Sequence, residues 1–130
     1  MLTIKKEVVA GIFDHARRDA PLEACGLLAE TAGIICAFYP LTNLDAATDH
    51  FTLDPKEQFE VIREMRKRGQ KLKALYHSHP VTEARPSAED IRLAYDPEIS
   101  YVIISLLGEG CIRSFRIKDS VIEEEEIKII

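Results

Sequence analysis

The sequence predicts a mixed α/β (α+β) fold in which one sheet is flanked by helices. Amphipathic helices are expected over residues 5–19 and 55–68, because apolar side chains recur there at helical spacing. Short apolar runs over 25–29, 72–79 and 100–106 predict strands. Since strands and helices are interspersed and several strands adjoin as hairpins, we expect both kinds of element to pack around one core.

A short strand over residues 2–4 is expected to precede the first helix. Pro21 lies just beyond residues 5–19, where a helix cannot easily continue. His15 lies among charged residues of this helix. We therefore expect its side chain to face solvent.

The next segment predicts a hairpin. Residues 25–29 and 34–39 are predicted as strands, and residues 30–33 supply the turn between them. Cys25 is expected to be a small core side chain, because nothing nearby in the sequence would activate its thiol. Glu23 precedes the first strand and, taken alone, would be an ordinary exposed carboxylate.

A polar loop and a short strand over 51–53 lead into the second helix. Asp54 is the expected N-cap, with Pro55 at the first helical position and Gly69 at the end. His50 borders the short strand and is expected at the surface. The buried stripe of the helix is predicted to contain Phe59, Ile62 and Met65.

Positive charge is concentrated at the end of the second helix and just after it. We interpret this charge as a solvated face that complements the helix dipole. The alternative is a docking patch for an acidic protein. The residues concerned are Arg63, Arg66, Lys67, Arg68, Lys71 and Lys73.

The C-terminal part predicts a short helix followed by strands. The helix is expected over 88–95, before Pro97, and the strongest strand signal follows over 100–106. Two further strands are expected over 111–117 and 121–130. Acidic residues in the last strand would form an exposed edge that discourages aggregation.

Composition limits the classes of function. With 130 residues, 46% of them hydrophobic and 30% charged, residues 1–130 are predicted to form a single domain. The net charge of −5 argues against a nucleic-acid or anionic-membrane binder. The N-terminus lacks the apolar core of a signal peptide, and three widely spaced cysteines favour a reducing cytoplasm over a disulfide framework.

A metal-ligand pattern organises the middle of the chain. His77 and His79 are two apart at the end of a predicted strand that Pro80 stops, so their side chains point to the same face. The chain then reaches Ser87, where a helix can begin, and Asp90 lies one turn into that helix. Two histidines and one carboxylate form an open three-ligand set, typical of a catalytic zinc site that leaves a position for water.

Helix capping offers a simpler explanation for part of this pattern. Ser87 is an acceptable N-cap, and Asp90 is an acid near the positive end of the helix dipole. Capping does not explain the His-Ser-His-Pro sequence at residues 77–80. A cap and a metal ligand are also compatible roles.

The spacing of His77, His79, Ser87 and Asp90 resembles the motif of the JAMM (MPN+) zinc metallopeptidases, which is His-x-His, seven residues, Ser, two residues, Asp. Residues 21–28 resemble the segment that carries the upstream glutamate of the family, with Glu23 in that position. The resemblance covers nearly the whole chain in element order. It implies a curved mixed sheet flanked by helices, the JAMM/MPN (cytidine-deaminase-like) fold, with zinc at one edge.

The resemblance also implies roles for these residues. His77, His79 and Asp90 would hold one Zn²⁺ per chain, with water as fourth ligand. Glu23 would take the proton of the water and later protonate the leaving amine. Ser87 would donate a hydrogen bond to the oxyanion.

Substrates of the family are bonds next to the Gly-Gly tail of ubiquitin or ubiquitin-like proteins. This compact chain resembles the small, stand-alone prokaryotic branch, whose members release cysteine or another adduct from a ubiquitin-like sulfur-carrier protein. The predicted function is therefore a zinc-dependent metallopeptidase, an enzyme of the JAMM hydrolase type, acting after the Gly-Gly of such a carrier.

Other functions remain open at this level. One is a non-catalytic MPN-type interaction scaffold, although such relatives typically lack the metal ligands. Another is an isopeptidase acting on other protein conjugates. A nucleobase deaminase would need His-x-Glu and Pro-Cys-x-x-Cys, which the chain lacks, and a non-haem iron oxygenase would use a comparable ligand set.

Overall fold

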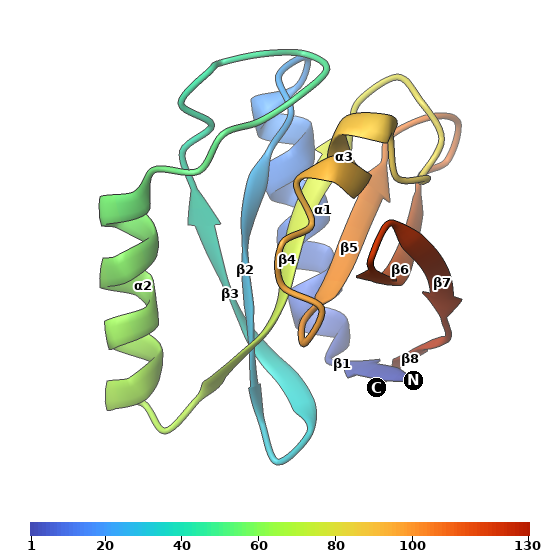
Figure 1. The fold of residues 1–130 in the computed structure, drawn as a ribbon. Helices are drawn as coiled ribbons and strands as arrows, with labels where there is room; N and C mark the ends of the chain where they lie inside the picture. Colours follow the sequence, from blue (N-terminus) through green and yellow to red (C-terminus); the bar gives the residue numbers. More distant parts are fainter.

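The structure, a computed structural model that describes all 130 residues, contains one eight-stranded sheet and three helices (Figure 1). The predicted fold class, a curved mixed sheet flanked by helices, is confirmed. In chain order the elements are β1 (Leu2–Ile4), α1 (Lys6–Asp19), β2 (Cys25–Thr31), β3 (Ile34–Leu41), α2 (Pro55–Lys67), β4 (Lys71–His79), α3 (Ala88–Arg92), β5 (Ser100–Ser105), β6 (Cys111–Lys118), β7 (Val121–Glu125) and β8 (Ile127–Ile129).

The strands lie in the order β7-β6-β5-β4-β2-β3-β1-β8. β4 and β5 pair in parallel, as β1 does with both β3 and β8, and the other pairs are antiparallel. This order puts β4, which carries both candidate histidines, between β2 and β5 near the middle of the sheet. No helix in the structure is both long enough and apolar enough to cross a membrane.

The single strand predicted over 121–130 is wrong. The strand is interrupted at Glu126. β7 pairs antiparallel with β6 up to this point, and β8 then pairs in parallel with β1 at the opposite edge of the sheet. The backbone N–H of Leu2 donates to the carbonyl of Glu126 at 2.8 Å. Because the sheet is curved, its two edge strands meet at this corner and cannot continue as one strand.

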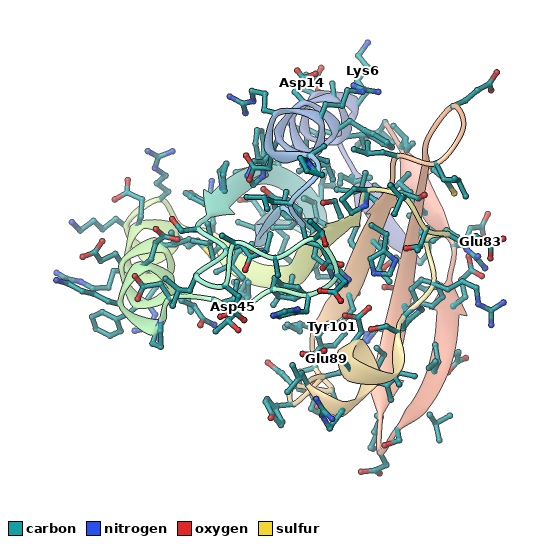
Figure 2. The ribbon with its side chains drawn as sticks, turned by 90° about the horizontal axis from the view of Figure 1, so that it is seen from above. Lys6, Asp14, Asp45, Glu83, Glu89 and Tyr101 are labelled. Carbon is teal, nitrogen blue, oxygen red and sulfur yellow. The ribbon has the colours of Figure 1, made fainter.

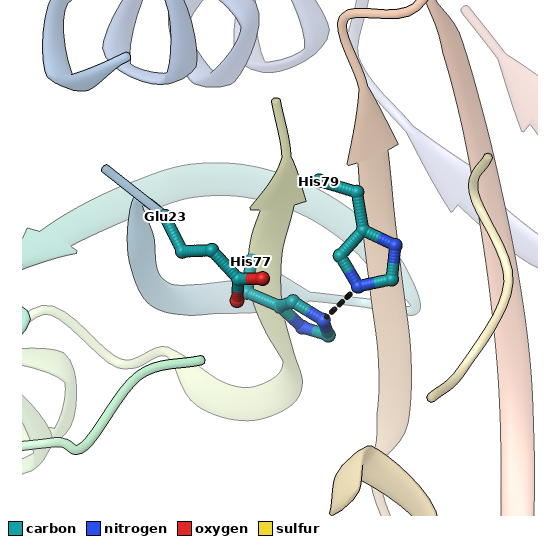
Figure 3. A group of neighbouring side chains, drawn as sticks. All are labelled: Glu23, His77 and His79. Atoms are coloured by element: carbon teal, nitrogen blue, oxygen red, sulfur yellow. Dashed lines mark hydrogen bonds between the residues drawn. The ribbon is translucent and has the colours of Figure 1, made fainter. Parts of the chain in front are cut away.

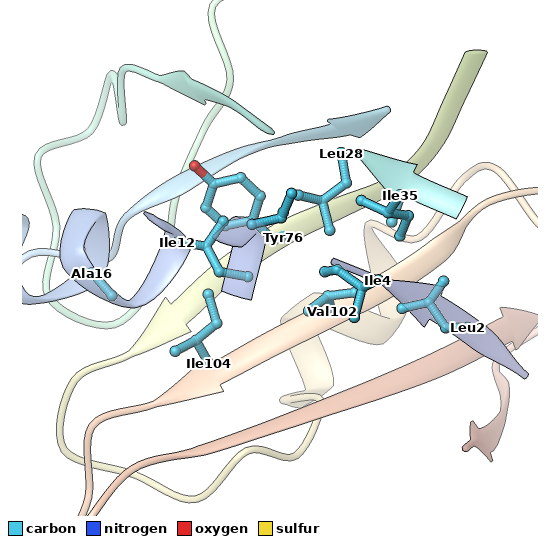
Figure 4. Close-up of a cluster of buried hydrophobic side chains, with 11 residues drawn as sticks. Leu2, Ile4, Ile12, Ala16, Leu28, Ile35, Tyr76, Val102 and Ile104 are labelled. Carbon is cyan, nitrogen blue, oxygen red and sulfur yellow. The ribbon is translucent and has the colours of Figure 1, made fainter. Parts of the chain in front are cut away.

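The two faces of the sheet are covered by different helices. α1 packs on the face that bears Leu28, Tyr76 and Ile104, and these side chains form the largest apolar cluster (Figure 4). Side chains alternate along a strand, so Leu27 and Ile103 point to the opposite face, towards α2 and α3. The candidate site therefore lies on the α2–α3 side of the sheet.

His15 does not face solvent, contrary to our expectation. Its side chain is 6% exposed, and Nδ1 lies 2.8 Å from the hydroxyl of Tyr76. His15 is three residues beyond the buried Ile12 and seven beyond the buried Val8, so helical periodicity places it on the core face of α1. The neighbouring Arg17 and Arg18 are exposed, whereas the carboxylate of Asp19 lies on the same side as His15, with Oδ2 3.1 Å from its Nε2.

Three other local expectations need correction. Phe59 is 63% exposed, because the contacts of α2 with the sheet are made by the buried Met65 and by half-buried neighbours. Residues 51–53 form no strand, and only a single bridge joins Leu53 to Asn43. α3 ends at Arg92, three residues before the predicted end.

Candidate metal centre

His77 and His79 lie at the C-terminal end of β4. Backbone pairing places Cys25 of β2 on one side of His77 and Ile103 of β5 on the other. Both histidines are buried, and their Nε2 atoms lie 3.1 Å apart (Figure 3). The predicted strand and the shared face of the two rings are confirmed.

Asp90 completes the three-atom cluster from α3. Its Oδ2 lies 3.2 Å from Nε2 of His77 and 3.2 Å from Nε2 of His79. Although burial opposes ionisation, hydrogen bonds from the two imidazoles hold the pKa of Asp90 far below its usual range. The structure therefore brings together the three residues that were predicted as ligands.

These three atoms fit a zinc ion. Ligands of a tetrahedral zinc with bonds of about 2.0–2.1 Å lie roughly 3.3 Å apart, close to the spacing observed here. Nδ1 of His79 lies 2.8 Å from the carbonyl of Glu83, and such a bond orients a metal-binding imidazole. Nδ1 of His77 has no such partner, and Phe51 stacks on its ring at 4.7 Å instead.

Glu23 is buried beside the two histidines, with 4% of its surface exposed. Its carboxylate lies within 4.8 Å of the ligand nitrogens of His77 and His79, and its Oε1 has no hydrogen-bond partner. Burial raises the pKa of Glu23 to about 7, with the charge of Asp90 adding to this effect and His79 opposing it. Glu23 is thus far from the exposed carboxylate that its local sequence would suggest.

Side chains outside the motif hold the Glu23 segment in place. The N–H of Ala24 donates to Oγ of Ser78 at 2.8 Å, and the N–H of Ser78 donates to the carbonyl of Ala24 at 2.9 Å. The amide of Asn43 donates to the carbonyl of Glu23 at 3.1 Å. Asn43 was not identified from the sequence, because nothing local distinguishes it from other loop asparagines.

Ser87 caps α3 in a capping box with Asp90. Its Oγ accepts the N–H of Asp90 at 3.0 Å, and its own N–H donates to Oδ2 of Asp90 at 2.9 Å. The hydroxyl hydrogen is not used by this bond. Ser87 can therefore cap the helix and still donate a hydrogen bond to another group.

A groove with a cavity volume of about 440 Å³ adjoins the cluster. Its lining is mostly apolar and includes strand residues that point between α2 and α3, such as Leu27, Leu75 and Ile103. His77 and Asp90 are part of its lining, so the groove adjoins the candidate metal centre. A mostly apolar groove with a few polar groups at the cluster is typical of a ligand-binding site.

The loop before α2 and the first turn of α3 both contribute to the lining of the groove. Figure 2 looks onto this end of the molecule, with Asp45 in the loop and Glu89 on α3. His50 and Glu89 both line the groove. His50 also contacts two carboxylates, Oδ2 of Asp45 at 3.2 Å and Oδ1 of Asp49 at 2.8 Å.

Comparison with known proteins identifies the family. The family model for prokaryotic homologs of the JAB domain matches residues 5–118. The chain belongs to this family. The resemblance to JAMM/MPN proteins predicted from the sequence is therefore confirmed.

The chain is also similar to individual proteins over most of its length. The chain is 37% identical over 134 residues to a CysO-cysteine peptidase of Mycobacterium tuberculosis, covering all of this chain and 92% of the relative. It is 32% identical over 111 residues to a desampylase of Haloferax volcanii, covering 80% of each. A protein from Desulfitobacterium hafniense has a solution structure with a TM-score of 0.92 and 44% identity, covering 100% of this chain and 93% of that one.

The relatives also bear on the enzyme class. Both curated relatives are named for a cleavage activity. The prediction of a metallopeptidase of the JAMM type is confirmed at the level of the family.

Proposed function

We propose that residues 1–130 form a single JAMM/MPN+ domain that hydrolyses the bond after the C-terminal Gly-Gly of a ubiquitin-like sulfur-carrier protein, for example releasing cysteine from an adduct. The observation that carries the proposal is the convergence of His77, His79 and Asp90 within 3.2 Å of one another, with Glu23 buried beside them. The mostly apolar groove that adjoins this cluster, and the names of the relatives, support the choice of substrate.

In the proposed reaction His77, His79 and Asp90 hold one Zn²⁺ per chain. When bound, zinc would polarise the scissile carbonyl and lower the pKa of the attacking water to roughly 7. Glu23 takes the proton of that water and delivers it to the leaving amine, a role for which a pKa of about 7 is well suited. His77 and Asp90 also line the groove, where the carrier tail would lie.

Ser87 serves the same reaction as an oxyanion donor. Its Oγ is held in position by the N–H of Asp90, so its O–H can be directed at the carbonyl oxygen as charge develops there. Removal of one such donor typically lowers kcat by about 10²–10³. We also propose a cytoplasmic location, which suits the free thiols of Cys25, Cys36 and Cys111.

The test uses the zinc-loaded protein and a ubiquitin-like carrier with one cysteine added after its Gly-Gly tail. Mass spectrometry should show loss of that cysteine from the Gly-Gly carrier and little loss from a matched Ala-Ala carrier. Equal cleavage of both carriers would rule out recognition of the tail. No cleavage of either by protein with full zinc occupancy would remove the peptidase proposal.

A second candidate is an isopeptidase that separates ubiquitin-like proteins from other proteins, and the desampylase relative supports it. The two candidates share the carrier tail and differ in the leaving group. A carrier joined to a lysine side chain should be cut faster than the cysteine adduct if the second candidate is correct. Relative kcat/KM values for the two substrates decide between them.

A further inference from the structure

The outward face of α2 carries an exposed aromatic side chain among unpaired cations. Phe59 is 63% exposed, and the guanidinium of Arg63 lies 6.0 Å from the centre of its ring. Arg66 and Lys67 follow three and four residues after Arg63, so they extend the same side of the helix. None of these three cations has a carboxylate partner, whereas Arg68 pairs with Glu64. We call Phe59, Arg63, Arg66 and Lys67 the α2 stripe.

The charge of this region is opposite to that of the remaining chain. Residues 56–73 contain seven lysines and arginines against three glutamates, although the whole chain has a net charge of −5. Outside this region acidic side chains therefore outnumber basic ones almost two to one. An acidic protein would be repelled by most of the surface and drawn to α2.

The α2 stripe begins next to the groove. The N-terminal end of α2 lies at the same end of the molecule as α3 and the tip of β4 (Figure 1). Gln58 lines the groove, and Phe59 is the next residue along the helix. A protein whose extended tail occupies the groove can therefore rest its folded body on the exposed side of α2.

We infer that the α2 stripe is the docking surface for the folded body of the carrier, and that the carrier presents an acidic surface to it. This inference rests on the proposed function, because it takes the carrier tail to lie in the groove. Phe59 supplies apolar contact area and the three cations supply charge pairs, and aromatic and arginine side chains are enriched at protein interfaces. Glu89 and Asp96 line the groove, and Asp45 and Asp49 contact His50 of its lining, which disfavours nucleic acid as the occupant.

The test compares two substrates of the zinc-loaded protein. One is the intact carrier–cysteine adduct, and the other is an eight-residue peptide of the same tail ending in Gly-Gly-Cys. The triple variant Arg63→Glu/Arg66→Glu/Lys67→Glu should raise KM for the adduct at least about tenfold with kcat nearly unchanged. Phe59→Ala should raise the same KM several-fold. Hydrolysis of the peptide should be unaffected in both variants, which also shows that the site is intact.

A matched control reverses three cations on α1, at the other face of the sheet. Lys6→Glu/Arg17→Glu/Arg18→Glu makes the same change in net charge and should leave both substrates within about twofold of the wild type. Raising the salt concentration should lower kcat/KM for the adduct in the wild type and in this control, and much less in the α2 triple variant.

Several outcomes would overturn the inference. These are equal effects of the α1 and α2 triple variants, an equal loss of peptide hydrolysis, or stripe-dependent binding of an RNA or DNA oligonucleotide in place of the carrier. If the wild type cleaves neither substrate, the proposed function fails separately. The Kd of the intact carrier for Glu23→Gln protein then still decides the docking surface, because the α2 variant should weaken it and the α1 control should not.

Discussion

At the scale of single residues, burial distinguishes Glu23 from the other carboxylates of the chain. Exposed glutamates are hydrated, whereas Glu23 has lost most of its water and has one oxygen without a partner. Burial disfavours the charged form of a carboxylate, so a buried carboxylate accepts a proton more readily than an exposed one. The role proposed for Glu23 as general base and acid follows from this environment.

Glu23→Gln keeps the shape of the side chain and removes its ability to take a proton. We expect the variant to fold, to bind zinc fully and to lose at least about a hundredfold in kcat. Metal analysis and steady-state kinetics measure the two properties on the same sample. Glu30→Gln at the other end of β2 is the control and should remain active, while near-normal turnover of Glu23→Gln would exclude Glu23 from the mechanism.

Asp90 combines two roles that can be separated by mutation. Asp90→Ala removes a proposed ligand and one half of the capping box, whereas Ser87→Ala removes only the other half of the box. We expect Asp90→Ala to lower zinc affinity by more than the 10–100-fold typical of losing an outer-shell partner. Ser87→Ala should change zinc affinity much less. Equal zinc affinities in the two variants would show that Asp90 acts only as a cap.

At the scale of elements, α3 is short enough to depend on its cap. Only five residues are helical. The Ser87–Asp90 capping box supplies acceptors for two backbone N–H groups at the start of the helix, those of Ser87 and Asp90. Ser87→Ala should destabilise the protein by about 1 kcal/mol. It should also lower kcat about 10²–10³-fold if the hydroxyl stabilises the oxyanion. Denaturant unfolding and kinetics of zinc-saturated protein separate these two effects, and a loss of stability without a loss of kcat would reject the catalytic role.

The pairing of β2 with β4 creates the site, because it sets Cys25 opposite His77 and so brings Glu23 to the histidines. Gly26, opposite Tyr76, permits the close approach of these strands and β3. A Cβ at Gly26 would lie 2.5 Å from the carbonyl oxygen of Tyr39 and 2.5 Å from the ring of Tyr76.

Gly26→Ala should therefore destabilise the protein by about 1–3 kcal/mol through overpacking. The shift of β2 should also lower kcat, since Glu23 lies three residues away. Chemical denaturation and kinetics measure the two effects. Ala29→Gly in the same strand provides a comparison without added volume, and an unchanged stability of Gly26→Ala would show that the strands separate freely.

At the scale of the whole molecule, His15 joins α1 to β4, the strand that carries His77 and His79, through its contact with Tyr76. Burial lowers the pKa of His15, although the nearby carboxylate of Asp19 opposes this effect. The folded protein therefore binds a proton at His15 less readily than the unfolded chain does. This contribution to stability is complete above the unfolded pKa of about 6.5 and is lost as pH falls towards the folded value.

His15→Gln should consequently make stability less sensitive to acid. Between about pH 7.5 and about pH 5 the wild type should lose more free energy of unfolding than the variant, with urea denaturation of zinc-free protein as the measurement. All other side chains are the same in both proteins, so their contributions cancel in the difference. Identical pH profiles would show that protonation of His15 does not oppose folding.

Local patterns in the sequence determined the metal motif and most elements. Residues two apart on a strand share a face, so His77 and His79 could be paired without knowledge of any other part of the chain. Ser87 and Asp90 were placed by the rules of helix capping, and the boundaries of α1 and α2 followed from periodicity and prolines. These features depend on neighbours within a few residues, where sequence and geometry are directly linked.

Only the tertiary structure decided which of these faces are covered, and by what. Glu23 reaches His77 across more than fifty residues through β2–β4 pairing, and β8 leaves β7 because the curved sheet offers β1 as its partner. The burial of two helical residues was also decided by tertiary packing. Phe59 is apolar but exposed, whereas His15 is polar but buried. Periodicity predicts the side of an element that can be buried, but burial itself depends on non-local packing, which no short stretch of sequence contains.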